Sequence, residues 1–244
     1  MYFEPGGIYH IYNQGNNRQK VFYSRENYIY FLRKLRIYIL PFADVLAWCL
    51  MPNHFHLMVE VRKVEVESIA PAFSEGFTLS EALTKPSEAL TKPSEALTKP
   101  SEALTKPSEA LTKPSEALTR QKPVKTDLNH SIGILLRSYT RAINTQEDRT
   151  GSLFRKKTKA ICLNEIKGIS SHWYTSFGVT FMKVDIPEYQ YPQVCFNYIH
   201  QNPVNAGLVV KAEDWEFSSY PDLVGMRAGT FVNRERVERL GLIC

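Results

Sequence analysis

The segment VLAWCLMPNHFHLMVEV, residues 45–61, contains two apolar runs separated by the turn-forming dipeptide Pro52-Asn53. This pattern predicts an antiparallel hairpin with strands at residues 45–50 and 54–61. Because side chains alternate along a strand, His54 and His56 fall on one face of the second strand and Phe55 falls on the other. The hairpin is therefore expected to carry both imidazoles on one face of a sheet.

The flanking segments supply the other elements of this sheet. Residues 8–13 alternate and predict a strand, and Ser24 is an expected N-cap for a helix with apolar side chains at helical spacing over residues 28–39. The same spacing over residues 132–143 predicts a second helix, and residues 158–162 predict a fourth strand. The order strand–helix–strand–strand–helix–strand is ferredoxin-like. The sequence therefore predicts an α+β fold: a ferredoxin-like βαββαβ core with an antiparallel sheet and helices on one face.

A heptad repeat, SEALTKP, interrupts this pattern over residues 80–121, with five full copies and a sixth, imperfect one. Proline in every repeat excludes a coiled coil, and one Leu in seven buries too little apolar area to offset chain entropy. We expect residues 74–126 to form a flexible, disordered insertion, either without a function or as a spacer or partner-binding tether. Residues 1–73 and 127–225 are then expected to form a single domain, and residues 226–244 a C-terminal tail.

Composition narrows the class of protein. No apolar run approaches the roughly 18 residues that cross a bilayer, and the first residues lack a signal-peptide pattern, so a cytoplasmic protein is expected. The four cysteines form no CxxC pair, which argues against a zinc ribbon or a disulfide framework. The net charge is +5, and ten Lys or Arg but only three acidic residues lie within residues 120–159. Such clustering is typical of a phosphate-backbone binder, although a solvated charged face would look the same.

Two groups of residues are candidates for metal binding and for nucleophilic attack. His54 and His56 could share one metal ion, although packed or surface histidines give the same pattern. Pro192 suits the first turn of a helix running to residue 202, on which Tyr198 and Asn202 share a face at i and i+4. A tyrosine nucleophile with a metal-binding side chain one turn away suits phosphoryl transfer. The alternative is that Tyr198 is a core aromatic, and the proline after Asn202 disfavours helical geometry there.

Four blocks in fixed order carry a family resemblance: YHIYNQGNNR at residues 9–18, MPNHFHL at 51–57, YIHQNPVNAGLV at 198–209 and DWEFSSY at 214–220. Together they resemble the REP-associated tyrosine transposases, a branch of the single-tyrosine HUH (IS200-like) transposases. The resemblance covers most of the chain except the heptad array and residues 168–191, which we expect to be an irregular surface excursion.

The resemblance implies a ferredoxin-like core and sequence- or hairpin-specific cleavage and strand transfer of single-stranded DNA through a 5′-phosphotyrosine. His54 and His56 match the paired metal ligands, Tyr198 the nucleophile, and Asn202 the polar side chain that completes the metal site. The metal is expected to be Mg²⁺ or Mn²⁺, and the partner single-stranded DNA with palindromic hairpins. The protein is expected to act as a monomer or homodimer, without a membrane, and to associate with the nucleoid when bound to DNA.

Other polar residues are expected to contact the DNA. Lysines and arginines around the fourth strand would line a groove, and residues after the first strand would contact a hairpin stem or flanking bases: Arg155, Lys156, Lys157, Lys159, Asn13, Asn16, Asn17 and Arg18. Trp215 and Phe217 either stack on bases or pack onto the sheet.

Three alternatives stay open at this point. The chain could be a hairpin-DNA-binding protein that no longer cuts. It could be an HxH metal hydrolase acting on a small molecule with Glu60 as its base. Tyr139 is a rival nucleophile, although its helical position favours the core, and His200, two residues after Tyr198, is a base in one interpretation and structural in the other.

Overall fold

The computed structural model describes residues 1–68, 124–164, 170–176, 179–185 and 187–244. Its central element is a four-stranded sheet in the order β2-β3-β1-β6. The strands are β1 (Ile8–Gln14), β2 (Ala43–Met51), β3 (His54–Val61) and β6 (Lys159–Cys162), and every neighbouring pair is antiparallel. The α+β fold with a ferredoxin-like βαββαβ core is thus confirmed.

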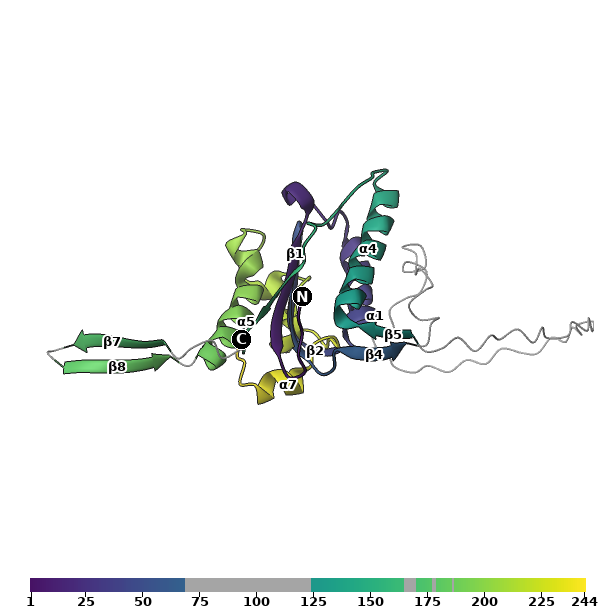
Figure 1. The fold of residues 1–244 in the computed structure, drawn as a ribbon. Coiled ribbons are helices and arrows are strands. Elements are labelled where there is room, and N and C mark those ends of the chain that lie inside the picture. Colours follow the sequence, from purple (N-terminus) through teal and green to yellow (C-terminus); the bar gives the residue numbers. More distant parts are fainter. Residues whose placement is uncertain (69–123, 165–169, 177–178, 186) are drawn as a thin grey trace, which may run out of the picture.

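Two helices cover one face of the sheet, α1 (Arg25–Ile39) and α4 (Leu128–Gln146), and they pack against each other (Figure 1). Ser24 caps α1 through a capping box with Asn27, and the Asp127 carboxylate accepts a hydrogen bond from the backbone N–H of His130 at the start of α4. Most of the apolar side chains at the predicted spacings are buried. The hydrophobic core therefore lies between this helical layer and the sheet.

Tyr139 belongs to that core. Its side chain is fully buried in α4, and its hydroxyl donates a hydrogen bond to the backbone oxygen of Val21 at 2.8 Å. Burial raises the pKa of Tyr139 well above the usual phenol value. The reading of Tyr139 as a nucleophile is therefore wrong.

A further helix, α5 (Pro187–Asn205), lies on the opposite face of the sheet, where it contacts β2 and β3 (Figure 1). The sheet is therefore covered on both faces, although the helices of the βαββαβ core share one. The helix begins before Pro192, the predicted start, and it continues through Pro203. Asn202 is consequently helical despite the proline that follows it, because the rest of α5 and its packing override the local bias.

Three predicted boundaries need correction. Val124–Asp127 form β5, which pairs with β4 (Glu65–Ser68), so the end of the predicted insertion is ordered; the heptad array itself lies outside the described residues. Residues 226–244 are no tail, because they include α7 (Arg234–Arg239) and pack on the core through buried Phe231 and Val237. Within residues 168–191, expected to be irregular, β7 (Ser170–Ser176) and β8 (Val179–Asp185) form a hairpin.

The described helices include none that is long and apolar enough to cross a bilayer.

Candidate active site

The imidazole-bearing face of the sheet lies under α5. His54 and His56 begin β3 and point to the same side, as predicted, with ring centroids 4.9 Å apart. The neighbouring strand β1 adds His10, whose ring stacks on His56 at 5.0 Å. His56 and His10 are buried, and His54 is half-buried. The alternation of β3 thus places the imidazoles where α5 can cover them.

Asn202 of α5 reaches between the two histidines of β3. Its Oδ1 lies 3.4 Å from Nε2 of His54, and its Nδ2 lies 3.3 Å from Nε2 of His56. Both imidazoles therefore direct the same ring nitrogen, Nε2, at one amide. The structure therefore brings Asn202 together with two histidines that lie almost 150 residues earlier in the chain.

The other ring nitrogens already have partners. Nδ1 of His54 lies 2.5 Å from Oδ1 of Asn53, and Nδ1 of His56 lies 2.9 Å from Nε2 of His10. Burial lowers the pKa of His54, lowers that of His56 to about 2 and lowers that of His10 to about 4. All three imidazoles are consequently neutral near pH 7, which is the protonation state that metal ligation requires.

Tyr198 lies one turn before Asn202, with its ring packed edge-on against the His56 ring at 5.3 Å. The residue is 47% exposed, in contrast to the fully buried Tyr139. The core interpretation of Tyr198 is therefore wrong: it is an accessible phenol beside two neutral imidazoles.

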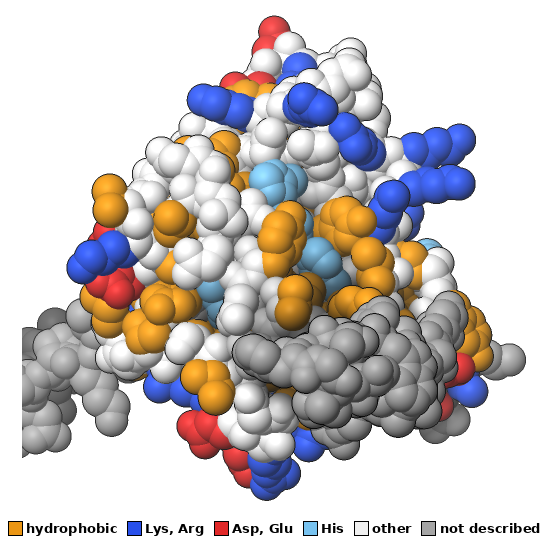
Figure 2. All heavy atoms as spheres, turned by 90° about the vertical axis from the view of Figure 1, so that its left-hand side faces the viewer, with side chains coloured by type: hydrophobic (Ala, Val, Ile, Leu, Met, Phe, Trp, Pro, Cys, Tyr) orange, Lys and Arg blue, Asp and Glu red, His pale blue; other side chains and the backbone are white. Residues whose placement is uncertain are grey.

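A cavity of about 230 Å³ opens beside Tyr198. Its lining combines the imidazoles with the end of β1 and with basic side chains: Tyr12, Asn13, Gln14, His54, His56, Arg155, Lys157, Lys159 and Tyr198. No carboxylate is among these lining residues, so the local charge favours an anion. Figure 2 shows histidine atoms in the middle of this face and a group of Lys and Arg side chains toward its upper right edge.

The predicted DNA-contacting residues divide into two groups. Arg155, Lys157 and Lys159 line the cavity, whereas exposed Lys156 does not. The second group, Asn16, Asn17 and Arg18, forms a 3-10 turn beyond the end of β1 and also stays outside the cavity lining.

Asn13 differs from its prediction. The residue is 4% exposed, and its side-chain amide donates hydrogen bonds to the backbone oxygen of Arg155 at 3.1 Å and to Oγ1 of Thr158 at 2.9 Å. The residue therefore ties the basic segment to β1. Because its amide hydrogens are already used inside the protein, we assign it a supporting role and not a direct contact with a ligand.

Sequence reasoning missed His10, Tyr12 and Gln14. Antiparallel pairing of β1 with β3 sets Tyr12 opposite His56 and Gln14 opposite His54. His10 falls on the same face because it is two residues before Tyr12. Once the strands were predicted, the alternation of residues 8–13 could have indicated His10 and Tyr12, and its extension by one residue Gln14.

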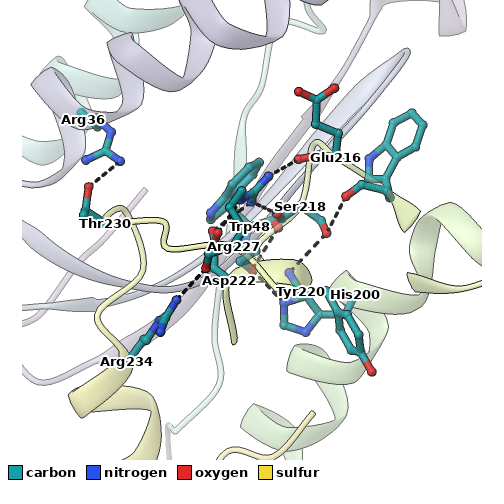
Figure 3. Close-up of polar contacts among 12 residues, drawn as sticks. Arg36, Trp48, His200, Glu216, Ser218, Tyr220, Asp222, Arg227, Thr230 and Arg234 are labelled. Atoms are coloured by element: carbon teal, nitrogen blue, oxygen red, sulfur yellow. Dashed lines mark hydrogen bonds and ion pairs between the residues drawn. The ribbon is translucent and has the colours of Figure 1, made fainter. Parts of the chain in front are cut away.

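His200 anchors the helix that carries Tyr198. Its Nε2 lies 2.8 Å from Oγ of Ser219, which also accepts a hydrogen bond from the backbone N–H of Trp48 at 2.9 Å. Burial lowers the pKa of His200 to about 3. These contacts join α5, β2 and the C-terminal segment, so the structural interpretation of His200 holds and the interpretation as a base does not (Figure 3).

Two aromatic residues of the C-terminal segment pack inward. Phe217 stacks on Tyr28 of α1 with ring centroids 3.8 Å apart, and Trp215 donates a hydrogen bond from Nε1 to the backbone oxygen of Leu50 at 3.1 Å. Packing, and not base stacking, accounts for both residues.

Glu60 is also paired inside the protein. The Glu60 carboxylate forms an ion pair with the guanidinium of Arg236 in α7, and Glu60 is 8% exposed. Glu60 lies on the imidazole face but is not among the residues lining the cavity beside Tyr198. The structure therefore gives no support to a small-molecule hydrolase with Glu60 as its base.

A buried ion pair locks the C-terminal segment. Arg227 binds the Asp222 carboxylate, with Nη2–Oδ2 at 2.9 Å, and also donates hydrogen bonds to the backbone oxygens of Glu216 and Ser218 (Figure 3). The Asp222 side chain is 2% exposed. Removing the arginine would leave the buried Asp222 carboxylate without its ion-pair partner.

We therefore expect Arg227→Ala to lower the free energy of unfolding by about 3 kcal/mol, because an unpaired buried charge is costly. Arg239→Ala is the matched control, since Arg239 pairs with Glu235 on the surface, and it should change stability by less than about 1 kcal/mol. Urea denaturation followed by circular dichroism measures both. Equal effects of the two variants would contradict the assignment of Asp222–Arg227 as a structural lock.

Comparisons with known proteins add one likeness. No protein-family model and no curated protein matches the sequence. Among solved structures, the chain is similar to one described as "Structure of the REP associates tyrosine transposase bound to a REP hairpin", at 12% sequence identity and a TM-score of 0.45. The alignment covers 92% of this chain and 83% of the other. At these values the likeness carries no argument, so the proposals below rest on the motifs and on the geometry of the site.

Proposed function

We propose that the protein is a single-tyrosine, metal-dependent enzyme that cuts and rejoins single-stranded DNA next to palindromic hairpins. One observation carries the proposal: α5 sets Tyr198 and Asn202 on one face, above the Nε2 atoms of His54 and His56 and beside a basic cavity. An accessible nucleophile, a set of neutral donors and an anion-binding wall are the three components of a phosphoryl-transfer site.

The residues present fit a divalent metal ion. Oδ1 of Asn53 can only accept a hydrogen bond, so it fixes the proton of His54 on Nδ1 and leaves a lone pair on Nε2. That lone pair faces Oδ1 of Asn202 at 3.4 Å, with no hydrogen between two acceptors. A cation between them would relieve this repulsion. His54, His56 and Asn202 would hold the ion.

Ligand chemistry bears on the identity of the metal. The described residues contain no cluster of three or more His, Cys, Asp or Glu side chains that could bind a metal. In the proposed site, the Asn202 amide oxygen is the third donor beside the two imidazoles. Two imidazoles favour Mn²⁺, whereas Mg²⁺ prefers oxygen ligands. When bound, either ion would neutralise charge developing on the phosphate.

Tyr198 is the nucleophile of the proposed reaction. Its phenol oxygen forms a bond to phosphorus as its own O–H bond breaks, and the bond from phosphorus to the 3′ oxygen breaks. The departing 3′ oxygen takes up a proton, leaving a 3′-hydroxyl and a 5′-phosphotyrosine. Attack by another 3′-hydroxyl on this phosphotyrosine reverses the step and joins two strands without an external energy source.

The cavity suits an unpaired strand. Tyr12 and Tyr198 offer ring faces or edges to bases, and Arg155, Lys157 and Lys159 offer cations to phosphates. Aromatic side chains beside a basic groove are typical of single-strand binding sites.

The basic wall gives a prediction on binding. We expect the double variant Lys157→Ala, Lys159→Ala to weaken binding of a hairpin oligonucleotide with an unpaired flank by about ten-fold or more. Because two phosphate contacts are lost, the slope of log affinity against log salt concentration should become shallower by about two. Fluorescence anisotropy at several salt concentrations measures both quantities. Lys63→Ala, an exposed lysine beyond the far end of β3, is the control and should bind as the wild type does. An unchanged salt slope in the double variant would remove these lysines from the DNA path.

Cleavage of a 5′-labelled hairpin oligonucleotide tests the proposal as a whole. The wild type should shorten the unpaired flank in Mn²⁺ or Mg²⁺ and leave it intact in EDTA. Tight hairpin binding without cleavage in either metal would favour the alternative, a hairpin-binding protein that does not cut.

A further inference from the structure

His10 is a buried histidine that the proposed reaction does not use. It lies on β1, is 8% exposed, and stands with Nε2 2.9 Å from Nδ1 of His56. Its ring centroid lies 4.8 Å from that of Tyr12 and 5.0 Å from that of His56, and the Tyr12 and His56 rings are themselves 5.9 Å apart. Its position beside His56 is therefore fixed by packing against Tyr12 as well as by the hydrogen bond.

The direction of that hydrogen bond follows from the other end of the His56 ring. The amide nitrogen Nδ2 of Asn202 can only donate, and it lies 3.3 Å from Nε2 of His56, so this Nε2 is the acceptor and carries no proton. A neutral imidazole has one N–H, so the proton of His56 must be on Nδ1. His56 therefore donates to Nε2 of His10, and His10 carries its own proton on Nδ1.

We infer that His10 is a positioning residue: it accepts the Nδ1 proton of His56 and so keeps the Nε2 lone pair of His56 directed at Asn202. The inference rests on the proposed function only where that lone pair is used to bind a metal. A partner on the far nitrogen of a metal-binding histidine fixes both the tautomer and the ring orientation.

Substitutions separate this role from simple packing. His10→Phe keeps an aromatic ring packed beside Tyr12 and His56 but offers no acceptor, so the proton of His56 is free to move to Nε2 and block the lone pair. His10→Gln offers an amide oxygen near the original position of Nε2 and should restore the acceptor. A purely packing role would predict the reverse order, because Phe resembles the stacked ring more closely.

The direct test is the tautomer of His56 in the metal-free protein. The chain has six histidines, so ¹⁵N–¹H correlation spectra of the labelled full-length protein can resolve each ring, with His56 assigned from the signals lost in His56→Gln. We expect the proton on Nδ1 in the wild type and in His10→Gln, and a shift toward Nε2 in His10→Phe. A wild-type His56 protonated on Nε2 would overturn the inference, and this outcome can be read even if His10→Phe does not fold.

Calorimetric titration with Mn²⁺, without DNA, gives the second readout. We expect His10→Phe to bind about 10- to 100-fold more weakly than the wild type, His10→Gln to recover most of this loss, and the exposed-histidine control His130→Gln to be unaffected. Equal Mn²⁺ affinity in the wild type and His10→Phe would also overturn the inference. If the wild type shows the expected tautomer but binds no Mn²⁺, the proposed metal dependence fails while the role of His10 in fixing the tautomer stands.

Discussion

Tyr198→Phe is expected to reduce cleavage of the hairpin oligonucleotide at least about a thousand-fold, because it removes the oxygen that attacks phosphorus and leaves the ring in place. The edge-on contact with His56 involves only the ring, so folding and DNA binding should be preserved. Single-turnover cleavage with enzyme in excess measures the chemical step.

Tyr191→Phe is the matched control for this experiment. Tyr191 is an exposed tyrosine on the same helix, two turns before Tyr198, and it is not among the residues lining the cavity. Its substitution should leave the rate unchanged. If Tyr198→Phe cleaved as fast as this control, another group would have to be the nucleophile.

His56→Ala is expected to abolish metal-dependent cleavage and to lower Mn²⁺ affinity at least about a hundred-fold. The variant removes one of two imidazole donors and also leaves Asn202 without its partner at 3.3 Å. Calorimetry on the DNA-free protein measures the affinity, and circular dichroism checks that the domain stays folded, since His56 is buried.

His54→Ala should reproduce this loss, because the two ligands act on one ion. His130→Ala, at an exposed position near the start of α4, should bind and cleave normally. Retention of Mn²⁺-dependent cleavage by both His54→Ala and His56→Ala would place the metal elsewhere or remove it from the mechanism.

Local sequence patterns were sufficient for much of the fold. The alternation around His54 and His56 and the apolar spacing of α1 and α4 depend on residues close in sequence, and these features are found as predicted. The pair of strands within residues 168–191 was missed because no clean alternation marks β7 and β8.

Features that depend on contacts between residues far apart in sequence were harder to predict. Residues 226–244 were predicted to be a tail, yet Arg236 and the backbone N–H of Asn233 attach them to Glu60 and Val45. Pro203 argued against helical geometry at Asn202, but α5 extends through it on the sheet face. In each case tertiary packing overrides a local preference.

The candidate site could likewise be predicted only in part from local patterns. Periodicity placed the histidines on one face and set Tyr198 one turn from Asn202, but it could not show that these two faces meet. The meeting of β3 and α5 depends on packing across the whole sheet, including the link from His200 through Ser219 to Trp48. For the same reason, the inward role of Asn13 became visible only when residues 155–158 were seen beside β1.

The most direct test of the central claim is to identify the covalent bond. The wild-type protein would be incubated with Mn²⁺ and a hairpin oligonucleotide, with its label placed 3′ of the expected cut, then denatured, digested and analysed by mass spectrometry. We expect a nucleotide joined through a 5′-phosphate to the peptide that contains Tyr198, absent in EDTA and absent in Tyr198→Phe. A DNA adduct on any other residue, or efficient cleavage with no adduct at all, would contradict the account.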